Sequence, residues 1–179
     1  MLQKYSVWKT MGIFFENPTK EHYLIDLSRT IKLSHTSVKN NINQLLKEEF
    51  IIETIEKKGS RKFPIYKANI NNNKYKQYKR IFNQLSIINS GLIEYLEQEI
   101  TPNNIILFGS YQRGEDIEDS DIDLFIESKN KELNLKNFEK TLKRKIQIHF
   151  KENFSSYPKE LKNNIINGII IYGFLEAFK

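Results

Sequence analysis

Apolar side chains recur at helical spacing through the first half of the chain. From Lys4 to Phe15 they follow i, i+3/i+4 and i+7 steps, which predicts a first helix. A second short helix is expected at 23–31, and a third is expected to begin after Ser34, whose hydroxyl can cap the first turn. The third helix would bury an apolar face made by Val38, Ile42, Leu45 and Leu46.

A strand-like pattern follows this helix. Residues 50–55 and 65–68 favour two strands, joined by a loop over 56–63 that turns at Gly59-Ser60. The distinctive segments of this half are Asn17-Pro-Thr-Lys20, Ser34-His-Thr-Ser-Val38 and Leu45-Leu-Lys-Glu-Glu-Phe-Ile51. In this pattern and these segments, residues 1–70 resemble the winged helix-turn-helix domains of prokaryotic regulators. A helix within 71–90 is expected to link them to the remainder, residues 91–179.

Charge is distributed unevenly between the two halves. Residues 1–90 carry 16 Lys+Arg and 7 Asp+Glu, whereas residues 91–179 carry 12 and 15. A basic half favours contact with duplex DNA, although the abundance of Ile, Asn and Lys is also what an AT-rich genome produces. The candidate DNA-binding residues are Ser34, His35, Thr36, Lys39, Asn40, Asn43, Lys57, Lys58, Arg61 and Lys62. The alternative, both for the residues of the third helix (34–43) and for those of the loop (57–62), is an ordinary solvated surface.

Other features narrow the class of protein. The chain has no cysteine, which excludes disulfides and Cys-ligated zinc. Apolar runs such as 169–172 are far too short to span a membrane, and no apolar signal core follows Met1. These features predict a cytoplasmic protein without membrane contact, and a homodimer is compatible with them.

The second half predicts an α+β domain. A helix at 92–100 should precede a buried strand at 105–108, which runs into Gly109-Ser110, and another strand should start at Asp121. The closing elements are expected at 134–144 (helix), 145–150 (strand), about 158–167 (helix) and 169–172. Such an order favours a mixed sheet.

Two carboxylates form the clearest chemical pattern. The alternation Asp121-Ile-Asp123-Leu124 places both acids on one face of a strand, about 7 Å apart. A Mg²⁺ ion bound with nucleotide phosphates would relieve their repulsion, and Gly109 and Ser110 can offer N–H groups and a hydroxyl to those phosphates. The alternative is an edge-strand pair of solvated acids. Glu115, Asp116, Glu118 and Asp119 are expected to form a mobile acidic loop.

The stretch from Phe108 to Phe125 resembles the signature of the DNA-polymerase-beta-like nucleotidyltransferase superfamily, whose nearest branch is the minimal nucleotidyltransferases. The resemblance covers roughly 92–175 and depends on Gly109-Ser110, Arg113-Gly114 and Ser120-Asp-Ile-Asp123. It implies that Asp121 and Asp123 are catalytic and bind one or two Mg²⁺ ions. It further implies an NTP, expected to be ATP, held by nucleotide-binding residues at Gly109, Ser110, Arg113 and Ser120.

One position departs from that family. Active members place a third acid on a later strand, and the aligned position here holds Gln147, a poor Mg²⁺ ligand that cannot usefully accept a proton. His149, two residues further on, is either a base or an ordinary half-exposed strand residue. If the third acid lies elsewhere, Glu152 is the first candidate.

Two functions therefore remain open. The first is Mg²⁺-dependent transfer of a nucleoside monophosphate from NTP to an acceptor hydroxyl, with pyrophosphate leaving. The acceptor would be a small molecule, an RNA end or a toxin-like partner protein, as in antitoxin-like minimal nucleotidyltransferases. The second is a DNA-binding transcriptional regulator whose nucleotidyltransferase-like domain is catalytically weak or inactive and binds a nucleotide or a partner protein.

Overall fold

The computed structural model describes residues 6–151 and 158–176. The chain divides into two compact units, Met1–Lys79 and Arg80–Lys179, and each has its own β-sheet. The division falls inside helix α4 (Asn73–Asn89), in the interval where the sequence predicts a linking helix. None of the helices in the described part of the chain is both long and apolar enough to cross a bilayer.

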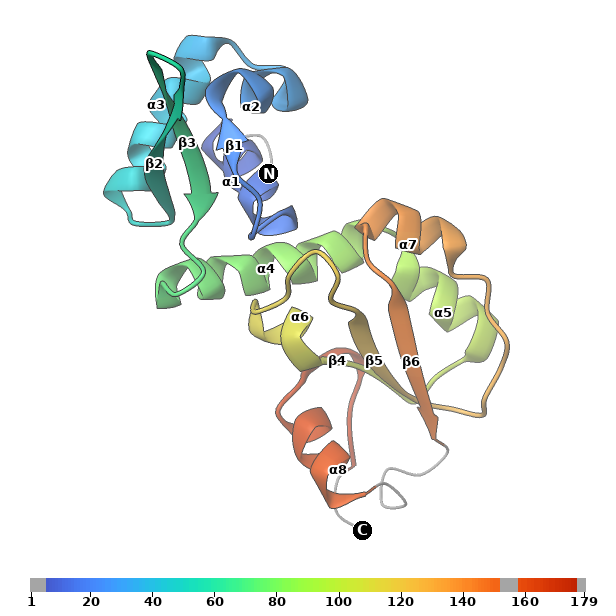
Figure 1. Cartoon of the computed structure of the whole chain (residues 1–179). Coiled ribbons are helices and arrows are strands. Elements are labelled where there is room, and N and C mark those ends of the chain that lie inside the picture. Colours follow the sequence, from blue (N-terminus) through green and yellow to red (C-terminus); the bar gives the residue numbers. More distant parts are fainter. Residues whose placement is uncertain (1–5, 152–157, 177–179) are drawn as a thin grey trace. The chain divides into compact units, whose positions relative to one another are not determined.

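The described part of the N-terminal unit combines helices with a small antiparallel sheet (Figure 1). Its elements before α4 are α1 (Ser6–Glu16), β1 (His22–Tyr23), α2 (Leu24–Ile31), α3 (His35–Lys47), β2 (Ile51–Lys58) and β3 (Arg61–Ala68). The strand order is β1-β3-β2, so the short strand β1, which the sequence pattern does not predict, pairs with β3. Ser34 caps α3 as predicted, because its hydroxyl accepts a hydrogen bond from Ser37 N at 3.2 Å.

The predicted apolar faces of α1 and α3 form much of the core of this unit. The buried members are Phe14, Phe15, Val38, Ile42 and Leu45. Trp8 and Leu46 are only half-buried. Asn41 is also buried on α3, where its amide donates a hydrogen bond to Thr10 Oγ1 at 2.9 Å. This bond satisfies a polar group inside the core.

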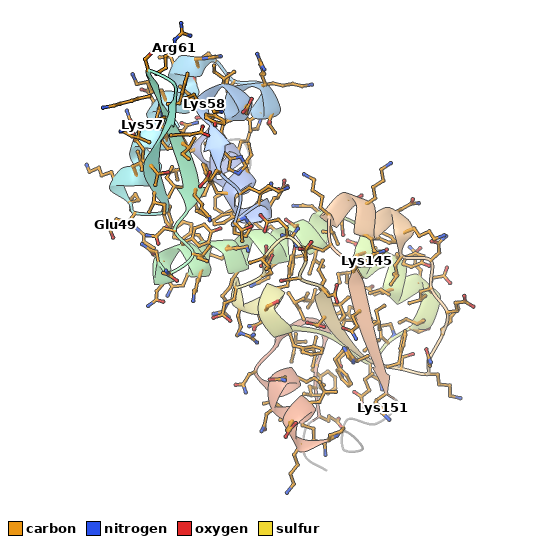
Figure 2. All side chains as sticks on the ribbon, in the orientation of Figure 1. Glu49, Lys57, Lys58, Arg61, Lys145 and Lys151 are labelled. Carbon is orange, nitrogen blue, oxygen red and sulfur yellow. The ribbon has the colours of Figure 1, made fainter. Side chains whose placement is uncertain are left out.

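The loop predicted over 56–63 is wrong, because most of these residues belong to a paired hairpin. Strands β2 and β3 stay paired as far as Lys58 and Arg61, so the turn consists of Gly59 and Ser60. Gly59 has a φ of +63°, which a two-residue hairpin turn requires and glycine readily adopts. Continued pairing satisfies backbone N–H and C=O groups that a longer loop would leave to water. The basic side chains therefore project from strands near the hairpin tip (Figure 2).

The C-terminal unit is built on a mixed sheet, as the sequence predicts, and its strands have the order β6-β5-β4-β7. Strand β5 pairs parallel with β6 and antiparallel with β4. The elements are α5 (Leu92–Ile100), β4 (Asn104–Phe108), α6 (Gly109–Arg113), β5 (Ile122–Glu127), α7 (Lys136–Leu142), β6 (Ile146–Lys151), α8 (Lys159–Ile166) and β7 (Ile169–Gly173). Helix α7 is shorter than the predicted 134–144 because Lys143 turns out of the helix with a φ of +55°.

Helices cover both faces of this sheet (Figure 1). One face of β5 carries the apolar side chains Ile122 and Leu124, which belong to the core formed with α5 and α7. On the other face, Phe125 packs in a smaller apolar cluster with Ile165 of α8. Because side chains alternate along a strand, Asp123 lies on the α8 side, next to this smaller cluster.

Candidate functional site

The two carboxylates predicted to carry the chemistry lie at the start of β5. Asp121 directly precedes the strand and is exposed, whereas Asp123 lies within it and is half-buried. Ile122 between them is fully buried on the opposite face. The buried apolar residue therefore anchors the strand and leaves Asp123 on the opposite side of the sheet, whereas Asp121 lies before the strand and lines a groove with α7.

Gly109 lies against Asp123. The preceding residue, Phe108, is the register partner of Asp123 across β4 and β5, so the start of α6 is brought beside the carboxylate. Gly109 has a φ of +78°, and a Cβ built on it would lie 2.2 Å from Asp123 Oδ2. This position therefore requires glycine on two grounds, its backbone conformation and its contact. Ser110 follows at the start of α6 and is half-buried.

The parallel strand β6 brings His149 to the other oxygen of Asp123. Asp123 and Gln147 are register partners, and His149 lies two residues further along the same side of β6. His149 Nε2 is 3.9 Å from Asp123 Oδ1, and the two side chains are 25% and 23% exposed. The imidazole also packs on the ring of Phe108, with ring centroids 5.3 Å apart. Gln147 is exposed, and the further candidate Glu152 lies outside the described residues.

The remaining predicted nucleotide-binding residues have partners within their own loop. Ser120 Oγ accepts a hydrogen bond from Ile117 N at 2.9 Å, so it shapes the turn that delivers Asp121. Arg113 Nε donates to Glu115 Oε2 at 2.8 Å, and these two side chains are 51% and 40% exposed. Arg113 is therefore held by Glu115 in this structure.

Asp116 does not belong to a mobile acidic loop, and that prediction is wrong for this residue. Its side chain is buried, Oδ1 accepts a hydrogen bond from Asn83 Nδ2 at 2.8 Å, and Oδ2 lies 3.4 Å from Arg144 Nη2. Asn83 Nδ2 also donates to Tyr111 O at 2.8 Å. Since the two partners of Asp116 are 33 and 28 residues away, no local sequence signal indicates this network.

A groove of about 620 Å³ lies beside Asp121. The loop that leads to Asp121 contributes Glu118, Asp119, Ser120 and Asp121 itself. Helix α7 and the turn after it contribute Lys136, Glu139, Lys140, Lys143, Arg144 and Lys145. The groove thus combines acids from one segment with mostly basic side chains from the other, a composition that suits a phosphate-bearing ligand accompanied by a cation.

Glu139 is an acid within the basic segment. Its carboxylate accepts a hydrogen bond from the backbone N–H of Ile146 at 3.2 Å and another from Lys145 Nζ at 3.3 Å. These contacts, the backbone bond first, lower the pKa of Glu139 below its ordinary value. Glu139 therefore stays ionised and fixes the end of α7 to the start of β6, where Figure 2 shows Lys145.

The donor set fits a divalent cation that arrives with a nucleotide. Within residues 6–151 and 158–176, no group of three or more His, Cys, Asp or Glu side chains is arranged to hold a metal ion. Mg²⁺ commonly binds through one or two carboxylates and completes its shell with substrate phosphates and water. Asp121 and Asp123 would supply those carboxylates. A permanent all-protein cage is not required.

The candidate DNA-contacting side chains of α3 are exposed, apart from the capping role of Ser34. They are His35, Thr36, Lys39, Asn40 and Asn43. The face opposite them is buried, as for a helix that presents one side to a partner.

The basic residues of the hairpin are not equivalent. Lys57, Arg61 and Lys62 are exposed and form no ion pair in the described part of the chain. Lys58 instead lies 3.2 Å from Glu56 Oε2 and donates to Tyr23 OH at 2.8 Å. Glu56 thus offsets the charge of Lys58.

Comparison with known proteins identifies the C-terminal unit. Residues 90–174 match the family model described as Polymerase beta, Nucleotidyltransferase. The match includes Gly109, Asp121, Asp123 and His149, so this part of the chain is similar to nucleotidyltransferase domains, as the sequence motif predicts. Neither the curated proteins nor the solved structures gave a match to the chain.

Proposed function

We propose that the C-terminal unit binds an NTP with a divalent cation and transfers the nucleoside monophosphate to an acceptor hydroxyl. The observation that carries this proposal is the close fit of Gly109 against Asp123, within a segment that matches a nucleotidyltransferase family. In this proposal Gly109 and Ser110 hold the triphosphate. Asp121 and Asp123 hold one or two Mg²⁺ ions, and ATP is the expected NTP.

The chemistry is one displacement at the α-phosphorus. The acceptor oxygen forms a bond to this phosphorus, the bond to the bridging oxygen breaks, and pyrophosphate leaves while the acceptor proton passes to a base or to water. Mg²⁺, when bound, stabilises the negative charge that develops on the phosphates. Lys136 and Lys140 line the groove beside Asp121 and would be available to phosphate oxygens that reach it. Arg113 would have to leave Glu115 before it could do the same.

The register of β5 and β6 supports a slow transfer reaction. Gln147 is the direct partner of Asp123 on β6, which is the position that the family resemblance assigns to the third acid. Without a carboxylate there, the acceptor hydroxyl lacks its usual base, and general-base help is typically worth about 10²–10⁴-fold in rate. We therefore expect NTP binding with poor turnover.

The same observation supports a second candidate function. If transfer is negligible, the domain would serve as a nucleotide or partner sensor in a DNA-binding transcriptional regulator. The acceptors to be considered for the enzyme remain a small molecule, an RNA end and a toxin-like partner protein.

Both candidate functions include DNA binding by the N-terminal unit. The order of its helices, followed by the β2–β3 hairpin, supports the proposal that this unit is a winged helix-turn-helix domain. The exposed face of α3 would enter the major groove, and the hairpin tip would contact phosphates. The basic character of residues 1–90 supports this proposal.

One experiment separates the two candidates. The full chain is incubated with Mg²⁺, ATP labelled on its α-phosphorus, and RNA or cell extract as the acceptor, and both pyrophosphate and label transfer are measured. The enzyme proposal expects slow release that is lost in the Asp121→Ala, Asp123→Ala double variant and raised in Gln147→Asp. If ATP binds but neither the native chain nor Gln147→Asp releases pyrophosphate, the enzyme proposal is wrong and the regulator remains.

A further inference from the structure

We propose that His149 and Asp123 together ligate a single divalent cation, and that the imidazole makes this site prefer a first-row transition-metal ion over Mg²⁺. The inference rests on the proposed function, in which Asp123 binds the cation that accompanies the NTP. It adds a ligand that replaces the third carboxylate and names the class of metal.

The spacing of the two donor atoms fits this role. His149 Nε2 and Asp123 Oδ1 are 3.9 Å apart, which is longer than a hydrogen bond. Two donors that each bind one ion at about 2.0–2.2 Å lie roughly 3–4 Å apart when the angle at the ion is open. The gap between the two side chains therefore has the width that an ion needs.

Both side chains are fixed before any ion binds. Asp123 is held in the middle of three paired strands, with Phe108 and Gln147 as its register partners. Gly109 lies against Oδ2, which leaves Oδ1 on the side of His149. The Phe108 ring packs on the imidazole at 5.3 Å, so the ligand pair needs little reorganisation.

The donor types determine the preference. Imidazole nitrogen is a good ligand for Co²⁺, Ni²⁺ and Zn²⁺, whereas Mg²⁺ prefers oxygen. The exposed amide of Gln147 is a weak competitor for either ion. Because no three-ligand group exists among the described residues, water, Asp121 or substrate phosphates would complete the coordination shell.

Co²⁺ is a suitable probe because its binding is measured without any activity. Calorimetric titrations of the full chain with Co²⁺ alone and with Mg²⁺ alone, in the absence of nucleotide, would compare the native protein with His149→Ala. We expect Co²⁺ to bind at least about 10-fold more tightly than Mg²⁺, and His149→Ala to weaken Co²⁺ binding by about 10-fold or more. The matched controls, Gln147→Ala on the same strand and the exposed His35→Ala, should leave Co²⁺ binding within twofold.

A second variant and a second measurement keep the test decisive. His149→Asp should shift the preference toward Mg²⁺, and in NMR spectra Co²⁺ should shift the imidazole protons of His149 but not those of His35. Unchanged Co²⁺ affinity in His149→Ala, or unshifted His149 protons at saturating Co²⁺, would overturn the inference. Either result leaves the proposed function standing, because that function is tested separately, by Mg-ATP binding in the Asp121→Ala, Asp123→Ala variant and by pyrophosphate release.

Discussion

A β-carbon at position 109 would lie 2.2 Å from Oδ2 of Asp123, so the Asp123 carboxylate can keep its position only because residue 109 is glycine. The contact joins the start of α6 to β5, two segments whose residues the family resemblance assigns to phosphate and to metal, respectively. An alanine at this position would displace the carboxylate, because the end of the Asp123 side chain is the nearest group that can move.

Gly109→Ala should therefore damage the site more than the fold. Its φ of +78° costs alanine about 1–2 kcal/mol, and the same cost applies to Gly59→Ala at +63°, where a Cβ has nothing within 4 Å. We expect similar losses of stability in the two variants by urea denaturation. Only Gly109→Ala should weaken Mg-ATP binding, by about 10-fold or more, because only there is the carboxylate displaced. Equal nucleotide affinity in the two variants would contradict this assignment.

Charge reversal at the hairpin tip should weaken DNA binding. Changing Lys57, Arg61 and Lys62 to Glu should lower the affinity for every duplex sequence and reduce the salt slope by about 0.9 for each phosphate that is no longer neutralised. Lys58→Ala should have a smaller effect than Lys57→Ala, because Glu56 already offsets the charge of Lys58. Gel retardation and fluorescence anisotropy at several salt concentrations measure both quantities. If the full chain retards no duplex at low salt, the proposal for this unit fails.

The buried pair of Asp116 and Arg144 should matter for stability. Their side chains are 1% and 5% exposed, so Asp116→Ala leaves a buried guanidinium without this carboxylate and should cost roughly 3–5 kcal/mol of unfolding free energy. The matched control is Glu115→Ala, which removes the exposed pair with Arg113 and should cost at most about 1 kcal/mol. Equal effects of the two substitutions on urea denaturation would show that the Asp116 network is not important.

The pH dependence of stability should include a contribution from Glu139. Its pKa in the folded chain lies below the ordinary value of 4.5, because the carboxylate accepts the Ile146 N–H and a bond from Lys145. The stabilisation is therefore fully present above about pH 4.5 and is lost as the pH falls toward the folded-state pKa. Glu139→Gln should be less stable than the native chain at pH 6, and the difference should shrink toward pH 3. A difference that is constant between these pH values would contradict the assignment.

Much of the fold follows from local patterns in the sequence. The cap at Ser34, the helix at 92–100 and the alternation around Asp123 depend on near neighbours, and the structure agrees with each. The sequence locates the turn at Gly59 correctly, but it predicts strands that are too short on both sides. The outer parts of both strands carry polar residues, so no apolar pattern marks them in the sequence. Backbone pairing alone extends the hairpin there.

The parts of the site that the sequence does not predict depend on contacts between distant segments. Asp116 looks like one of several loop acids, and its burial depends on Asn83 and Arg144 in other elements. The closeness of His149 to Asp123 depends on the parallel register of β5 and β6, which no local motif specifies. Sequence spacing alone could single out Asp123 as a candidate site residue, but it could not show that His149 lies beside it.

Calorimetric titration of Mg-ATP tests the central claim most directly. The native full chain should show saturable binding that requires the divalent cation, and the Asp121→Ala, Asp123→Ala variant should lose it while its circular dichroism spectrum is unchanged. Glu132→Ala, which removes an exposed acid of the same unit that does not line the groove, should bind within about twofold of the native chain. Unchanged Mg-ATP affinity in the double variant, or no binding by the native protein, would contradict the assignment of this site.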